Sequence, residues 1–194
     1  MRKYHVFAAA LACGVIAAGA AQAADTATTV ITLSGTAPNT CNIPSAPTAP
    51  SSSNMTLAGG GTAAANSVTV TDIFNATTGS LTGGNITLRY ANVVCNYNAT
   101  IGLRTTNGNL TAAAGTIVGG TFLNDIDYTA SATWGAAPVA TLNATGTAGA
   151  TVNQAAGGAN VADLDLTITV APSATPVVGG TYSDTLTLQV GAAL

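Results

Sequence analysis

Charged side chains are scarce in this sequence. Only 6% of its residues are Asp, Glu, Lys or Arg, whereas about a quarter is usual in globular proteins. The single histidine, His5, and two of the four basic residues, Arg2 and Lys3, lie at the very start, so Arg89 and Arg104 are the only basic side chains beyond them. Two arginines cannot form the basic patch that nucleic acids require. Without a later histidine, histidine-based catalysis and the commonest zinc ligand are excluded as well.

The first 23 residues have the pattern of a secretory signal peptide. Two basic residues precede an apolar run over 6–20, and Ala21-Gln22-Ala23 supplies the small residues of a cleavage site. A membrane anchor is the alternative, but the run is shorter than the about 20 residues that a spanning helix needs. We therefore expect export with cleavage after Ala23. The mature chain would carry two arginines and seven aspartates, a net charge of 2 − 7 = −5.

Two cysteines, Cys41 and Cys95, remain after that cleavage. Paired cysteines are usual in exported proteins. A bridge between these two would close a loop of about 55 residues and stabilise the fold by about 4 kcal/mol in the entropic description. Two buried free thiols are the alternative. We expect the disulfide.

Alternation of apolar and polar residues recurs along the mature chain, and no segment shows helical periodicity. With 47% hydrophobic residues, the chain is too apolar for a disordered segment, and short alternating runs between Gly and Pro turns favour a β-sandwich. Asn107-Gly108 is a hairpin signal. Strands are predicted over 68–74 (Val68, Val70 and Phe74 on one face), 85–95, 99–105, 116–123, 125–134, 139–142 and 162–170, with a long loop over 44–66 that holds one short strand at 55–57, and a further loop over 144–159.

The end of the sequence forms the clearest strand. Leu186, Leu188 and Val190 share one face, and the alternation continues to Leu194, which is therefore expected on the same apolar face. The preceding Gly179-Gly180 turn predicts a hairpin between this strand and the one over 162–170.

Two further features could carry chemistry. Trp134 is expected to be a core or sheet-edge anchor, with a platform for a sugar ring as the alternative. The pairs Asp125/Asp127 and Asp163/Asp165 each place two carboxylates on one side of a strand, as a hard cation would require. Neither pair continues into a known calcium loop, so we expect solvated aspartates, no metal and no cofactor.

Three stretches resemble the spore coat protein U family of secreted, pilin-like subunits of archaic chaperone–usher pili. They occur in the order in which the family has them. The first is the Thr-rich segment 24–35 followed by Asn39-Thr40-Cys41, and the second is the strand around Cys95 with its Thr-Asn-Gly-Asn-Leu turn. The third is Gly-Thr-Tyr-Ser-Asp-Thr-Leu-Thr-Leu over 180–188. The aromatic–glycine turn that the family tends to carry is absent from 44–66 here.

The resemblance implies an immunoglobulin-like sandwich over 39–194 that lacks its last strand, preceded by an N-terminal donor strand over 24–38. A periplasmic chaperone would fill the open groove until the donor strand of another subunit replaces it at the outer-membrane usher. Thr29, Ile31 and Leu33 would enter the groove of the neighbouring copy. The groove edge and chaperone-binding strand would comprise Leu186, Leu188, Val190 and Leu194, the last through its terminal carboxylate.

The expected function is therefore a non-enzymatic structural subunit of a pilus or coat at the cell surface, with other subunits, a chaperone and an usher as partners. The alternative is a self-complete secreted β-sandwich that binds a polysaccharide or surface ligand through Trp134 and Asn-rich loops. A hydrolase is the weakest of the three hypotheses, because it would need a pair of catalytic aspartates. The position of 28–33 distinguishes the first two, because a self-complete domain would pair this segment within its own sheet.

Overall fold

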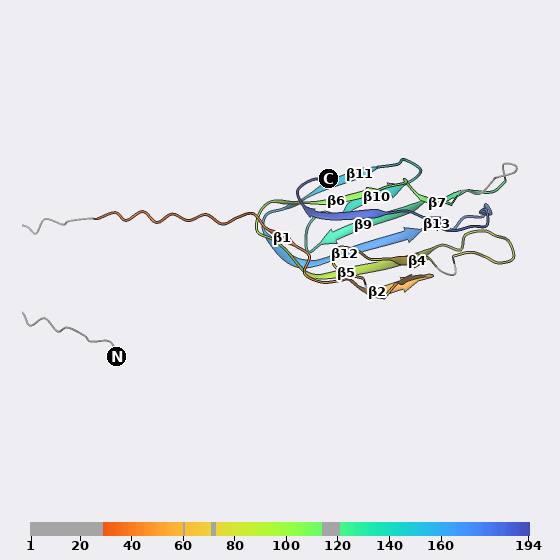
Figure 1. Cartoon of the computed structure of the whole chain (residues 1–194), viewed down its shortest axis with the longest axis horizontal. Helices are drawn as coiled ribbons and strands as arrows, with labels where there is room; N and C mark the ends of the chain where they lie inside the picture. Colours follow the sequence, from red (N-terminus) through yellow and green to blue (C-terminus); the bar gives the residue numbers. More distant parts are fainter. Residues whose placement is uncertain (1–28, 60, 71–72, 114–120) are drawn as a thin grey trace, which may run out of the picture. The chain divides into compact units, whose positions relative to one another are not determined.

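The computed structural model describes residues 29–59, 61–70, 73–113 and 121–194. The chain divides into two units, Met1–Thr36 and Ala37–Leu194, and the described part of the first, 29–36, contains no strand. Fourteen strands and no helix occur among the described residues (Figure 1). The expected all-β class is thus confirmed. Within the same residues, no helix could cross a membrane.

All fourteen strands lie in the second unit. They are β1 (Cys41–Asn42), β2 (Thr48–Ser53), β3 (Met55–Leu57), β4 (Val68–Val70), β5 (Gly84–Cys95), β6 (Ala99–Thr105), β7 (Leu110–Ala112), β8 (Asp125–Ile126), β9 (Tyr128–Trp134), β10 (Ala140–Ala144), β11 (Thr151–Gly157), β12 (Asn160–Val170), β13 (Tyr182–Ser183) and β14 (Leu186–Gly191).

The largest sheet has the strand order β1-β5-β12-β9-β10, and β2 also pairs with β5. All of its pairs are antiparallel. Leu164, Leu166 and Val170 of β12 are buried and the half-buried Ile168 shares their face, whereas Asp165, Thr167 and Thr169 point away from the core. This follows from the period of two in a strand, and it gives the sheet one apolar and one polar face.

A three-stranded sheet, β11-β6-β14, forms the opposite wall of the core. Ile101, Leu103 and Thr105 of its central strand are fully buried, and residues of both sheets belong to a single hydrophobic cluster. Two small sheets, β13-β7-β8 and β3-β4, complete the unit. Curled antiparallel sheets around one core are the arrangement of a β-sandwich.

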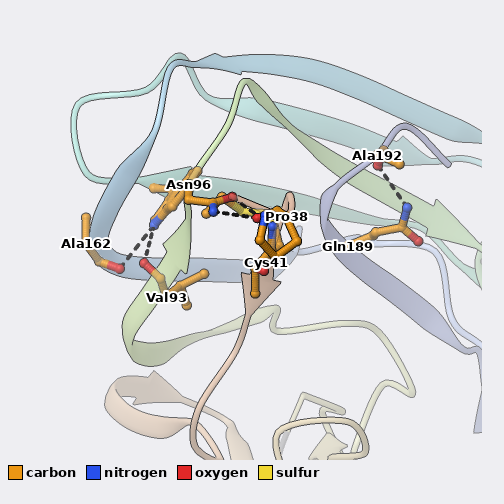
Figure 2. Close-up of a disulfide and its surroundings, with 10 residues drawn as sticks. Pro38, Cys41, Val93, Asn96, Ala162, Gln189 and Ala192 are labelled. Atoms are coloured by element: carbon orange, nitrogen blue, oxygen red, sulfur yellow. Dashed lines mark hydrogen bonds between the residues drawn. A yellow bond between two sulfur atoms is a disulfide. The ribbon is translucent and has the colours of Figure 1, made fainter. Parts of the chain in front are cut away.

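The disulfide between Cys41 and Cys95 is present, as the sequence predicted. The two cysteines lie directly opposite each other on β1 and β5. The next residue, Asn96, accepts a hydrogen bond from the Thr40 backbone N–H and donates one to the Pro38 carbonyl, both at 2.8 Å. Figure 2 shows this cluster, which fixes the start of the second unit on the end of β5.

Trp134 is a core residue. Its side chain is fully buried, and its indole N–H donates to the carbonyls of Val93 and Ala162 at 3.2 and 3.1 Å (Figure 2). Both carbonyls lie beside a β-bulge at which the β5–β12 register shifts. A buried indole cannot stack on a sugar, so the ligand-platform alternative for Trp134 is wrong.

The chain changes sheets between β12 and β14. The predicted hairpin through Gly179-Gly180 is wrong, because β12 pairs with β5 and β9, while β14 pairs with β6. Between these strands, Ser173 and Val177 form isolated bridges with other segments. The turn at Asn107-Gly108 likewise leads out of β6 into β7, which pairs with β13 and β8 and not with β6.

Three other expectations differ from the structure. The region 144–159 contains the strand β11, and the expected loop over 44–66 contains β2 in addition to β3. Pro50 lies within β2, which its place at the sheet edge allows. Phe74 is 41% exposed, whereas its neighbour Ile73 is buried, so Phe74 does not share the buried face. Most of the predicted strand over 116–123 lies outside the described residues.

Candidate functional site

An apolar groove lies between the two main sheets of the second unit. Its volume is about 450 Å³. Aliphatic side chains from both sheets and from the β3–β4 hairpin form most of its wall, with the segment 63–66 beside them. The aliphatic residues of the wall are Ile43, Met55, Val68, Val70, Leu88, Leu110, Leu166, Ile168, Val170, Leu186 and Leu188.

The strand β14 borders this groove and is the last strand of its sheet. It pairs with β6 on one side, and within the described residues no strand pairs with its other side. Leu186 and Leu188 are half-buried and face the groove. A free backbone edge beside an apolar groove is the surface to which an added strand can bind, because the edge supplies hydrogen-bonding groups and the groove accepts alternate side chains.

Of the other two residues expected at this edge, Val190 lies on β14 outside the groove and Leu194 lies beyond the end of the strand. Val190 is half-buried opposite Ile101 of β6 and packs against the core, outside the groove. The alternation stops at Gly191, where β14 ends with φ at +131°. Leu194 packs over Gly102, and its backbone N–H donates to the Asn153 side chain at 2.9 Å.

The expectation that Leu194 continues the apolar face of β14 is therefore wrong. Gly102 alternates along β6 with the buried Ile101 and Leu103, so Leu194 covers the outer face of that sheet. Glycine at position 191 permits the change of direction, because positive φ carries little cost without a Cβ. The absence of a side chain at Gly102 leaves room for the leucine.

Asp184, just before β14, anchors the end of the groove. Its carboxylate accepts hydrogen bonds from the hydroxyls of Thr105 and Tyr128, the latter at 2.6 Å. It also accepts hydrogen bonds from the backbone N–H groups of Asn107 and Thr185, at 2.8 and 2.7 Å. This one side chain thus joins the start of β14, the end of β6 and the start of β9. It explains the aspartate in the Tyr-Ser-Asp-Thr-Leu stretch, a role that the sequence did not reveal.

These contacts shift the pKa values of both partners. Burial raises the pKa of Asp184, but the hydrogen bonds from Thr105, Tyr128 and the two backbone groups outweigh burial and hold the pKa below its ordinary value. Burial and the hydrogen bond to Asp184 raise the pKa of Tyr128. Asp184 therefore stays ionised and Tyr128 stays neutral around pH 7, so the cluster is a fixed anchor and not an acid–base pair.

A second polar pair lies in the groove wall. The Asn66 amide approaches the Tyr90 hydroxyl at 3.4 Å, and burial raises the pKa of Tyr90. The rest of the wall is mostly aliphatic, with Tyr128, Asp184 and two threonines of 185–187 near the start of β14. This wall suits an apolar occupant with few polar contacts.

The expected donor residues belong to the first unit. Ile31 and Leu33 are 77% and 90% exposed, and Thr29 is exposed as well. Val30, which alternates with them, is 85% exposed. Residues 29–36 belong to no strand. Three large apolar side chains in a short exposed segment are unusual for a segment with no partner.

The aspartate pairs have other partners in the structure. Asp165 makes a bidentate ion pair with Arg89, with both N–O distances at 2.7 Å, and Asp163 accepts the backbone N–H of Asn92 at the bulge. Asp125 and Asp127 both lie near the Asn109 amide. Among the described residues, no group of three metal-ligating side chains occurs.

Comparisons with known proteins give no relative for this chain: no family model, no curated protein and no solved structure matches it.

Proposed function

We propose that this chain is a structural subunit of a cell-surface pilus or coat, polymerised by donor-strand complementation through a chaperone and an usher. The observation that carries the proposal is the apolar groove of about 450 Å³ beside the unpaired edge of β14. The same chain also offers an occupant, the exposed segment that contains Thr29, Ile31 and Leu33. In this account the domain is an immunoglobulin-like sandwich completed by a strand from the next copy.

The physical basis is β-augmentation. An added strand forms a backbone ladder with β14 while every second side chain enters the groove. Burying one Leu or Ile side chain contributes about 1.5–3 kcal/mol, and the new backbone hydrogen bonds add to this. Before assembly, a chaperone strand would cover the same edge, because an exposed edge beside an apolar groove promotes aggregation.

The direction of the added strand follows from where the second unit begins. Cys41, which follows the first unit, lies close to Gly191, the far end of β14. A donor subunit at that end would compete for space with residues 38–41 of the acceptor, which Asn96 and the disulfide hold there. We therefore place the donor subunit at the Leu186 end, with its strand antiparallel to β14. This places Leu33 opposite Leu186 and Ile31 opposite Leu188.

The test is the assembly state of the exported protein. Unboiled samples on denaturing gels should show a ladder of oligomers that collapses to a monomer on boiling, since the subunits are joined without covalent bonds. A purified chain that is a stable monomer without a chaperone would contradict the proposal.

A self-complete binding module is the second candidate. The groove volume lies within the range of about 300–1,000 Å³ that is typical of small-molecule sites, and Asn66, Tyr90 and Tyr128 provide polar groups in its wall. This function predicts a monomer whose melting temperature rises when a soluble sugar is added, and it predicts no gel ladder.

A further inference from the structure

One polar pair in the groove wall has incomplete hydrogen bonding. The Tyr90 hydroxyl accepts a hydrogen bond from the Asn66 amide at 3.4 Å and donates its own proton to no group among the described residues. The amide oxygen of Asn66 is buried and has no hydrogen-bond partner within the same part of the chain. Buried polar groups without partners lower stability. An occupant that brings a hydroxyl group to this pair is therefore favoured over one that is apolar there.

The polar cluster at the other end of the groove is already complete. The Asp184 carboxylate accepts four hydrogen bonds, from the hydroxyls of Thr105 and Tyr128 and from the backbone N–H groups of Asn107 and Thr185. An ionised carboxylate has about four sites that accept hydrogen bonds. A further hydroxyl group would gain little at this end, so the two polar ends of the groove differ in what they require from an occupant.

The incomplete pair lies at the far end of β14. Along β5, Tyr90 is nearer to Cys95 than the groove residue Leu88 is. Cys95 is bonded to Cys41, which lies close to Gly191. The carboxylate cluster lies at the opposite end, beside the start of β14. A donor strand antiparallel to β14 therefore brings its first residues toward the incomplete pair.

The donor segment has side chains in the matching order. Thr29, Ile31 and Leu33 alternate along it, and in an extended strand such residues face the same way about 6.6 Å apart. With the two apolar residues opposite Leu188 and Leu186, the threonine is the next side chain toward the incomplete pair. In a parallel strand, the threonine would instead meet the saturated carboxylate, and the leucine would meet the polar pair.

We propose that Thr29 is a specificity-determining residue, whose hydroxyl binds the Asn66–Tyr90 pair of the next copy and so fixes the direction and register of the donor strand. A hydroxyl group both donates and accepts, so one threonine can accept the proton of Tyr90 and donate to the amide oxygen of Asn66. A strand shifted by two residues would place Ile31 against the pair and leave both groups without partners, which disfavours that register. This inference rests on the proposed function.

The experiment is a double-mutant cycle on the full exported chain. It measures the rate at which isolated oligomers lose subunits in denaturing detergent at a fixed temperature. Thr29→Val and Tyr90→Phe each remove one hydroxyl and keep the shape of the side chain, and each should accelerate dissociation about tenfold. If the two hydroxyls bind each other, the double variant should dissociate about as fast as either single variant.

The matched control is Thr32→Val. It removes a hydroxyl from the same segment at a position that points away from the groove in an added strand, so the dissociation rate should not change. Thr29 belongs to the first unit, so its variant leaves the residues of the groove unaltered. An effect of Thr29→Val therefore reports on the junction between two copies.

Faster dissociation in both single variants, with no further effect in the double variant and none in the control, supports the proposal. A wild-type ladder that Thr29→Val and Thr32→Val leave equally stable overturns it while the proposed function stands. An unchanged rate in Tyr90→Phe, or two effects that multiply in the double variant, overturns it in the same way. A wild type that forms no ladder overturns the proposed function, and this inference with it.

Discussion

A single charge in the donor segment should prevent assembly. The proposed function places the side chain of Ile31 in the groove of a second copy, between the aliphatic residues of β12 and β14. Ile31→Asp removes an apolar contribution of about 1.5–3 kcal/mol. It also requires an unpaired carboxylate to leave water, which costs several kcal/mol more. The junction should therefore weaken by about 5 kcal/mol or more, and each 1.4 kcal/mol is about a tenfold change in affinity.

The assay is the ladder of oligomers on unboiled denaturing gels. Wild-type protein should give the ladder, and Ile31→Asp should give a monomer. The domain itself should still fold with its chaperone, because the groove is formed by residues of the second unit. Val30→Asp is the matched control: Val30 is exposed as well, but in an added strand it would point away from the groove, so its charge would stay in water. Normal polymerisation of Ile31→Asp, or equal loss in Val30→Asp, would refute the reasoning.

Three other predictions concern the domain. Mass spectrometry without reduction should find no free thiol in the exported chain, and reduction of the Cys41–Cys95 bridge should lower the free energy of unfolding by about 4 kcal/mol; two cysteines that react with alkylating reagent would contradict this. Asp184→Ala should lower the free energy of unfolding by about 1.5–3 kcal/mol. Because its pKa is lowered in the folded state, the stabilisation by Asp184 should be complete above the unfolded value of about 3.9 and disappear as the pH falls through the folded value. An acid unfolding curve that is the same in the variant would argue against this role. Asp163→Asn with Asp165→Asn should cost at most about 1 kcal/mol, as for exposed ion pairs, and calcium should leave the melting temperature of the wild type unchanged; a calcium-dependent rise that the double variant lacks would reveal a metal site.

The strongest alternation in the sequence predicted the strands that form the core. The runs over 85–95 and 162–170 match β5 and β12 because each buries every second side chain. The strand β11 was missed, since its inward positions, Val152, Gln154 and Ala156, carry only one large apolar side chain. A polar glutamine and a small alanine contribute little to a hydrophobic pattern even when the backbone is paired. Pro50 similarly concealed β2, which tolerates it as an edge strand.

Strand partners and the groove wall were harder to predict. Alternation assigns a residue to a face but does not identify the neighbouring strand, so β14 was expected beside β12 and lies beside β6. Leu186 and Leu188 face the groove, but Met55, Val68 and Val70 reach it through a hairpin that is remote in sequence. Leu194 was placed on the wrong face because the glycine at 191 ends the strand.

Cysteine pairing between two different chains tests the central claim most directly. One chain carries Ile31→Cys and the other Leu188→Cys, and the two are expressed together and exported. Side chains directly opposite on paired strands have Cβ atoms about 4.5–5.5 Å apart, close enough for a disulfide after a small adjustment. Donor-strand complementation predicts a covalent dimer that joins the two chains, and no such dimer when Val30→Cys replaces Ile31→Cys. Absence of the dimer, or equal yield with Val30→Cys, would contradict the account.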